Sequence, residues 1–119
     1  MTRVFVYGTL KRGGANHFIL AGQQFLGPAR TPPGYTLHLI EDYPGMVRAA
    51  DDRAGVVGEL WAVDVGCLLR LDELEGVIEG LYERVPLRLA PPHAGEPAET
   101  YLYLRDLAGC PALGSEFRT

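Results

Sequence analysis

The nine residues Leu68 to Gly76, which read LLRLDELEG, decide how the rest of the chain is interpreted. Their spacing predicts a short amphipathic helix. Asp64, four residues upstream, can cap the start of this helix, because its side chain can accept from an unpaired backbone N–H group. Gly76 can supply the left-handed residue that commonly ends a helix. The sequence therefore predicts one helix, with the rest of the chain arranged on either side of it.

Glu75 is the unusual residue of this stretch. At about 100° per residue it falls within the apolar side of the helix, while two charged residues fall opposite. The apolar side carries Leu68, Leu71 and Leu74, and the opposite side carries Arg70 and Glu73. A carboxylate that faces the interior is costly unless it is paired, protonated or used. Glu75 is then either an ion-paired glutamate at the helix rim, or a general acid or base whose pKa is raised by apolar surroundings.

Length and composition place limits on the class of protein. A chain of 119 residues suits a single domain spanning residues 1–119. The formal net charge of −4 gives no electrostatic footprint for nucleic acid or an anionic membrane. No apolar run reaches the length of a membrane span, and no signal sequence precedes the first strand, so a cytoplasmic location is expected. The oligomeric state is left open.

Strands dominate the rest of the chain. They are expected at Thr2–Gly8, Gln24–Ala29, Tyr35–Ile40, Met46–Arg48, Val56–Val63, Tyr82–Leu89 and Thr100–Leu104. Asn16 is expected to cap one or two helical turns, Asp42–Gly45 to form a turn, and the tail from Asp106 to be a loop. One helix among many short strands predicts an α+β fold, in which the sheet curls into a small barrel.

The loop Gly8–Gly14 follows the first strand and contains three glycines and two cations. Backbone N–H groups at such a strand exit can converge on an anion, although a simple connecting loop is the alternative. The register of a P-loop is missing, so a nucleotide is not expected. Tyr7, immediately before the loop, adds a rigid aromatic ring with a polar tip. Further along, Tyr82 and Arg84 share one face of a strand, as an exposed pair or as the polar wall of a pocket.

Other chemistries find little support. The three histidines are far apart, without the spacing of metal ligands, so no metal site is expected. Ser115 is the only serine and lies in the tail without a neighbouring base. Cys67 falls early in the apolar side of the helix and is expected in the core. Cys110 lies in the tail, and without a C-x-x-C motif both thiols are expected to be free.

Four segments resemble the γ-glutamylcyclotransferase-like family. They are Val6–Leu10 (VYGTL), Gly58–Asp64 (GELWAVD), Leu71–Gly76 (LDELEG) and Tyr82–Arg84 (YER), and they occur in the family's order over roughly residues 3 to 105. The family includes γ-glutamylamine cyclotransferases, plant avirulence-induced proteins and a butirosin-deprotecting enzyme. The first segment, continued as Lys11-Arg12-Gly13 with Asn16-His17, looks closest to the γ-glutamylamine branch.

The resemblance implies a site as well as a small mixed β-barrel with flanking short helices. It implies that Glu75 is the catalytic acid and base and that a loop holds the glutamyl end of the substrate. The substrate-binding residues implied are Tyr7, Gly8, Thr9, Leu10 and Tyr82, with the amides of the loop on the α-carboxylate or the developing oxyanion. An error in the helix register would transfer the role of Glu75 to Asp72 or Glu73.

The reaction implied is the cyclisation of a small-molecule γ-glutamyl amine. The α-amino group attacks the side-chain carbonyl and releases 5-oxoproline and a free amine, without metal, cofactor or covalent nucleophile. The leaving amine stays open among an amino acid, an ε-lysine, a polyamine and a natural-product amine, and hydrolysis to glutamate is conceivable. The alternatives are a non-catalytic module that binds a small ligand in the same pocket and, more weakly, a scaffolding domain.

Overall fold

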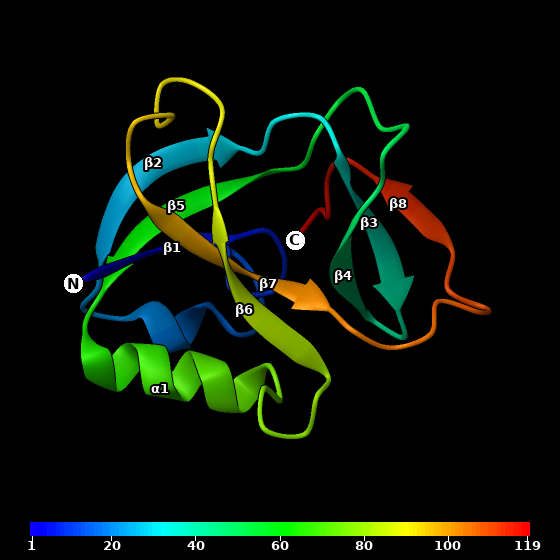
Figure 1. Ribbon diagram of the computed structural model, residues 1–119. Coiled ribbons are helices and arrows are strands. Elements are labelled where there is room, and N and C mark those ends of the chain that lie inside the picture. Colours follow the sequence, from blue (N-terminus) through cyan, green and yellow to red (C-terminus); the bar gives the residue numbers. More distant parts are fainter.

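The first strand, β1 (Thr2–Val6), lies at the centre of the larger of two sheets in the computed structural model, which describes residues 1–119 (Figure 1). The five-stranded sheet has the order β2-β5-β1-β7-β6, and the three-stranded sheet has the order β4-β3-β8. The remaining elements are η1 (His17–Leu20, a 3-10 helix), β2 (Gln24–Arg30), β3 (Tyr35–Ile40), β4 (Tyr43–Arg48), β5 (Val57–Val63), α1 (Val65–Leu74), β6 (Tyr82–Leu87), β7 (Ala98–Tyr103) and β8 (Ala112–Gly114).

The central position of β1 follows from its composition. Val4, Phe5 and Val6 are at most 2% exposed. Phe5 packs in one core cluster, and Val4 and Val6 pack in the other. A strand with apolar side chains on both faces is stable only when both faces are covered. β1 runs antiparallel to β5 and parallel to β7, so the strand expected at Thr2–Gly8 is confirmed, with its end at Val6.

The helix α1 begins and ends at the residues that the sequence predicts. Asp64 is the N-cap, and its carboxylate accepts from the backbone N–H group of Cys67 at 2.8 Å. At the other end Gly76 has a φ of +63°, and the N–H groups of Gly76 and Val77 donate to the carbonyls of Glu73 and Asp72, both at 3.1 Å. This pair of bonds is a Schellman motif.

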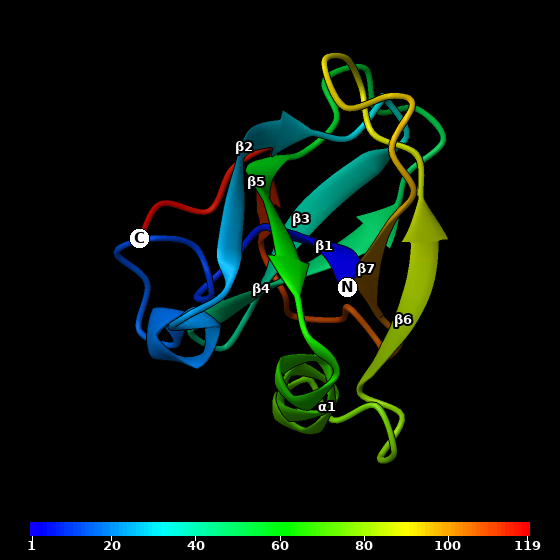
Figure 2. The same cartoon turned by 90° about the vertical axis from the view of Figure 1, so that its left-hand side faces the viewer.

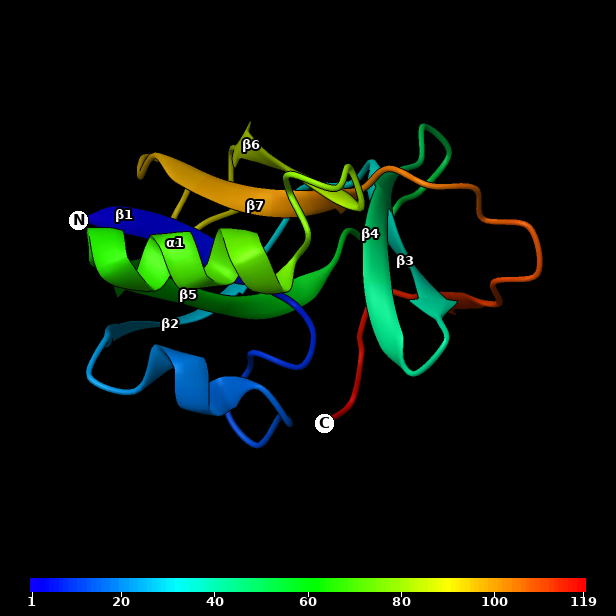
Figure 3. The same ribbon diagram turned by 90° about the horizontal axis from the view of Figure 1, so that it is seen from below.

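The apolar side of α1 is narrower than its leucines suggest. The residues of the helix that are buried are Cys67 and Leu71, whereas Leu74 is 40% exposed. Leu74 packs in neither core cluster and instead lines a cavity at the end of the helix. Figure 2 shows α1 end-on against the sheet, and Figure 3 shows the β3–β4 hairpin standing across the end of that sheet.

Several expectations require correction. The tail is not only a loop, because β8 pairs with β3. The turn before β4 is shorter than expected: Tyr43 already belongs to the strand, and Glu41 has a φ of +58°. Asn16 precedes η1 without a capping bond, because its amide instead donates to the Thr9 hydroxyl at 3.0 Å.

The architecture is mixed α+β, with mostly strands and one α-helix. The hydrogen-bonded pairings leave two separate sheets and do not close them into a ring, so the barrel is not confirmed. Gly58 marks a close backbone approach, since a Cβ there would lie 2.3 Å from the Val6 carbonyl oxygen. Pro86 lies in the edge strand β6, where its missing N–H group leaves no gap in the ladder. No helix has the length and apolar character needed to span a membrane.

Candidate active site

A cavity of about 350 Å³ lies between the loop after β1, the start of β4, the end of α1 and the start of β6. Its volume is at the lower end of the range of roughly 300–1,000 Å³ that is typical of small-molecule sites. The structure brings together here all six residues that were singled out as the site. These are Tyr7, Gly8, Thr9, Leu10, Glu75 and Tyr82.

Glu75 occupies the C-cap of α1, and its backbone N–H group donates to the Leu71 carbonyl at 2.9 Å. This bond fixes the helical phase, so the side chain faces the cavity and not the charged face of the helix. Burial alone raises the pKa of Glu75 from 4.5 to about 7. No ion pair or hydrogen bond in the protein offsets the lost hydration, so the carboxyl group is available to a ligand.

Phenol rings surround the Glu75 carboxyl. The pKa of Tyr7 and that of Tyr82 are both raised, mainly by burial. The negative charge of Glu75 is a further cause for both residues. The same charge contributes to the raised pKa of Tyr101, after burial and a hydrogen bond to Asp72. These phenols therefore remain protonated at neutral pH, and they form a neutral wall beside the Glu75 carboxyl.

The loop after β1 presents unpaired backbone donors to the cavity. The N–H groups of Gly8, Thr9 and Leu10 make no hydrogen bond within the protein. The carbonyl of Gly8 accepts from the N–H group of Lys11 at 3.1 Å, and Thr9 and Leu10 lie within this tight turn. Gly14 closes the loop, where a Cβ would lie 2.1 Å from the Thr9 carbonyl oxygen. Unpaired N–H groups at a strand exit can bind an anion.

The hydroxyl groups of Tyr7 and Tyr82 have partners within the protein. Tyr7 donates to the Tyr101 carbonyl at 2.7 Å and accepts from the Met46 N–H group at 3.2 Å. Tyr82 donates to the Pro44 carbonyl at 2.8 Å. Both tyrosines thus line the cavity with their rings, and their hydroxyl groups hold β4 in place over the loop.

Other candidate residues lie outside the cavity. Arg84 does not line it, because its guanidinium binds Asp72 at 2.9 Å and Glu99 at 2.8 Å. The Asp72 carboxylate also accepts from the Tyr101 hydroxyl at 2.6 Å, so it is fully engaged. Glu73 is exposed on the far face of the helix. The interpretation of Arg84 as pocket wall is wrong, and neither alternative carboxylate of the helix faces the cavity.

Several other residues that line the cavity have no signal in the sequence. Asp42, Tyr43 and Pro44 come from the β3–β4 hairpin, Leu81 precedes β6, and Asn16 follows the loop. The hairpin reaches the cavity through contacts with residues more than thirty positions away, such as the bond between Tyr82 and Pro44. No local pattern could have predicted this placement.

The fold and the cavity define a class: a mixed α+β protein with a cavity of small-molecule size, which is lined by the unpaired carboxyl of Glu75 and by a loop with unpaired backbone donors. A family model described as "Gamma-glutamyl cyclotransferase, AIG2-like" matches residues 4–116. The chain therefore belongs to the γ-glutamyl cyclotransferase, AIG2-like family.

Individual relatives agree with this membership. A Vibrio cholerae protein, provisionally named as a gamma-glutamylcyclotransferase, is 45% identical over 74 residues, which are 62% of each chain. The human gamma-glutamylaminecyclotransferase is 36% identical over 96 residues, covering 75% of this chain and 62% of its own. The chain spans less than two thirds of the length of both relatives. The crystal structure of a mouse AIG2-like protein is 27% identical and has a TM-score of 0.70, covering 88% of this chain and 77% of its own.

Proposed function

We propose that this protein is a γ-glutamyl cyclotransferase that converts γ-glutamyl amines into 5-oxoproline and a free amine, with Glu75 as general acid and base. One observation carries the proposal: the unpaired carboxyl of Glu75, with a pKa of about 7, shares a cavity with the unpaired N–H groups of Gly8, Thr9 and Leu10. An acid that titrates near the working pH can both accept and donate a proton.

The first step is removal of a proton from the α-ammonium group of the substrate by the Glu75 carboxylate. The free amine then attacks the side-chain carbonyl carbon of the same glutamyl group, and a carbon–nitrogen bond closes a five-membered ring. Nucleophile and electrophile belong to one molecule, so the cavity needs only to hold the folded conformer. The apolar rings of Tyr7 and Tyr82 suit that task because they are fixed by their hydroxyl groups.

The second step expels the amine. Attack places a negative charge on the carbonyl oxygen, and the loop N–H groups can stabilise either this oxyanion or the α-carboxylate. The bond to the departing nitrogen breaks as Glu75 returns a proton to it. Overall the attacking nitrogen loses two protons and the leaving amine gains two, so one carboxyl can relay both. These steps require neither a metal ion nor a cofactor.

The finer assignment to γ-glutamyl amines draws on the relatives. The human protein is named gamma-glutamylaminecyclotransferase, and a 30% identical protein of Niallia circulans is named gamma-L-glutamyl-butirosin B gamma-glutamyl cyclotransferase. Both names place an amine on the γ-glutamyl group. We further propose that residues 1–119 act as a single domain, since the family model spans nearly the whole chain.

The test is the release of 5-oxoproline from a panel of γ-glutamyl amides by the wild-type protein and by Glu75→Gln. The substitution keeps the shape of the side chain and removes the titrating group, so kcat is expected to fall by roughly 10²- to 10⁴-fold. Glu73→Gln is the matched control, because Glu73 is an exposed glutamate of the same helix. It is expected to retain wild-type kcat.

The dependence of kcat/KM on pH provides an independent check. Since the carboxylate form of Glu75 must accept the first proton, kcat/KM is expected to rise with pH through about 7. Wild-type turnover in folded Glu75→Gln would contradict the role of Glu75. Amides that bind to the wild-type protein and are never converted would instead favour a non-catalytic binding module.

A further inference from the structure

The cavity is acidic and contains no basic side chain. Its charged residues are the two carboxylates Asp42 and Glu75, and no lysine, arginine or histidine lines it. The substrate carries an α-ammonium and an α-carboxylate, which together are neutral. A net charge on the leaving amine is therefore exposed to the negative potential of the two cavity carboxylates, which no basic side chain neutralises.

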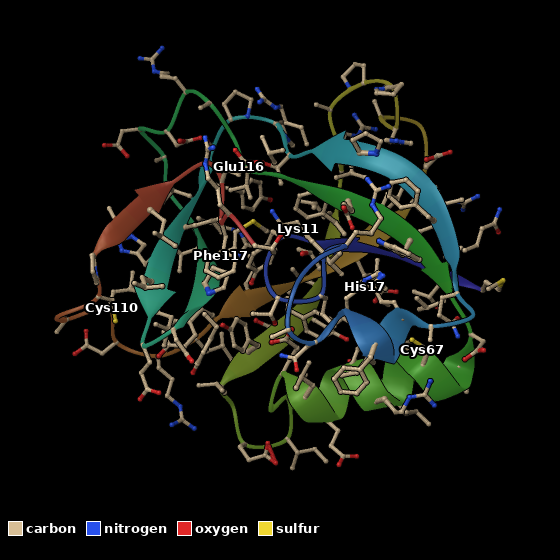
Figure 4. All side chains as sticks on the ribbon, turned by 180° about the vertical axis from the view of Figure 1, so that it is seen from behind. Lys11, His17, Cys67, Cys110, Glu116 and Phe117 are labelled. Atoms are coloured by element: carbon tan, nitrogen blue, oxygen red, sulfur yellow. The ribbon has the colours of Figure 1, made fainter.

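The two cations of the loop after β1 are turned away from the cavity. Lys11 is buried, and its ammonium donates to the carbonyl of Phe117 in the C-terminal tail; Figure 4 shows the two residues together. The Arg12 guanidinium pairs with Glu59 at 3.1 Å and lies over the ring of Phe25 at 3.9 Å. Neither side chain neutralises the carboxylates of the cavity.

Asp42 lies at the rim. Its side chain is exposed and also lines the cavity, whereas Glu75 is half-buried. Asp42 sits in the turn between β3 and β4, directly after Glu41 with its left-handed backbone. It has no hydrogen bond or ion pair to its carboxylate within the protein. The part of the cavity nearest to solvent is thus bordered by an unpaired carboxylate.

The negative field of this turn reaches the cavity wall. The pKa of Tyr43, which lines the cavity between Asp42 and Pro44, is raised. The largest cause is burial, followed by the charge of Glu41, with smaller contributions that include Asp42 and Glu75. A positive group beside Tyr43 would lower the energy of all three carboxylates.

We propose that Asp42 selects the leaving amine, favouring a γ-glutamyl amide whose amine bears a second positive charge, as in a diamine or polyamine, over one that bears a carboxylate. This inference rests on the proposed function and names its substrate class. It separates amines of the polyamine type from amino acids, since an amino acid brings its own carboxylate to the rim.

The experiment uses three γ-glutamyl amides with the same four-carbon chain and different end groups. Their amines are 1,4-diaminobutane (cationic), butylamine (neutral) and 4-aminobutanoate (anionic). The wild-type protein is expected to give the highest kcat/KM for the diamine and the lowest for 4-aminobutanoate. An exposed ion pair contributes roughly a two- to five-fold effect, so each step in this series is expected to be of that size.

Asp42→Asn tests the residue. It is expected to reduce the ratio of kcat/KM between the cationic and anionic amides by roughly four-fold or more, because it removes one attraction and one repulsion. Asp51→Asn is the matched control: the same substitution at another exposed aspartate, beyond the opposite end of β4. The strand separates the two positions by roughly 20 Å at about 3.3 Å per residue, about twice the Debye length at 0.1 M salt.

Two outcomes would overturn the inference: equal kcat/KM for the three amides, or a preference that Asp42→Asn leaves unchanged. Release of 5-oxoproline from none of them would overturn the proposed function instead. In that case the inference is tested by calorimetry with wild type, Asp42→Asn and Asp51→Asn. The wild type is expected to bind the diamine amide most tightly and the 4-aminobutanoate amide most weakly, and Asp42→Asn to reduce this difference.

Discussion

Replacement of Glu75 by glutamine is expected to stabilise the folded protein at alkaline pH while it removes the proposed acid and base. Burial raises the pKa of Glu75 from 4.5 to about 7. In the unfolded chain the carboxyl is hydrated and titrates near 4.5. The gap of roughly 2.5 pH units, at about 1.4 kcal/mol per unit, corresponds to about 3 kcal/mol of unfolding free energy.

The sign follows from which state binds the proton more tightly. The folded protein holds the proton of Glu75 up to about pH 7, and the unfolded chain releases it near pH 4.5. The wild-type protein therefore loses stability as pH rises between these values, and it loses no more above the folded pKa. Glutamine is neutral throughout. The variant is thus expected to match the wild type near pH 4.5 and to exceed it by about 3 kcal/mol at pH 8.

The assay is urea unfolding at pH 5 and pH 8, followed by the fluorescence of Trp61, which is the single tryptophan and is buried. For slopes of about 1–3 kcal/mol per molar urea, 3 kcal/mol moves the midpoint by about 1–3 M. Glu73→Gln is the control, and its difference from the wild type should be the same at both pH values. The reasoning is refuted if Glu75→Gln gains no stability over the wild type between pH 5 and pH 8.

Three further predictions concern the framework of the site. Gly14→Ala forces a Cβ to within 2.1 Å of a backbone carbonyl oxygen, whereas a Cβ at Gly95 meets nothing within 4 Å. Gly14→Ala is expected to lower the unfolding free energy by more than about 2 kcal/mol and to remove most of kcat/KM. Gly95→Ala is expected to leave both quantities unchanged in the same unfolding and rate measurements. Tyr82→Phe removes the hydrogen bond to the carbonyl of β4 and is expected to lower the unfolding free energy by about 1 kcal/mol in urea titrations. Phe117→Ala removes a ring that packs on the core, at the residue whose carbonyl accepts from Lys11. It is expected to lower the unfolding free energy by about 2 kcal/mol and to raise KM. An unchanged KM would show that the tail does not order the loop.

Local features of the chain were open to prediction from the sequence. The capping of α1 by Asp64 and its end at Gly76 depend on residues within one helical turn. The burial of β1 depends on three consecutive apolar residues, Val4 to Val6. The orientation of Glu75 followed from helical phase alone, because its backbone bond to Leu71 keeps the period of the helix.

Features that depend on residues far apart in the chain could not be predicted from the sequence. The strand β8 is three residues long and has no apolar alternation, and it forms because β3 offers an edge for pairing. The side chain of Arg84 turned to Asp72 and Glu99, on a helix and on the neighbouring strand, and no pattern within Tyr82–Arg84 indicated those partners. Leu74 remained partly exposed because it lines the cavity and packs in neither core cluster.

Local sequence specifies where the helix starts and stops, that the carboxylate at its C-cap faces inward, and that a glycine-rich loop follows a buried strand. These are consequences of backbone geometry and side-chain period over a few residues. Long-range packing is what brings Glu75 and the loop into one cavity, and what places Asp42 of the β3–β4 hairpin at the rim of that cavity. The reason is that long-range contacts, such as those of Tyr7 with Met46 and Tyr82 with Pro44, join segments that have no local relation.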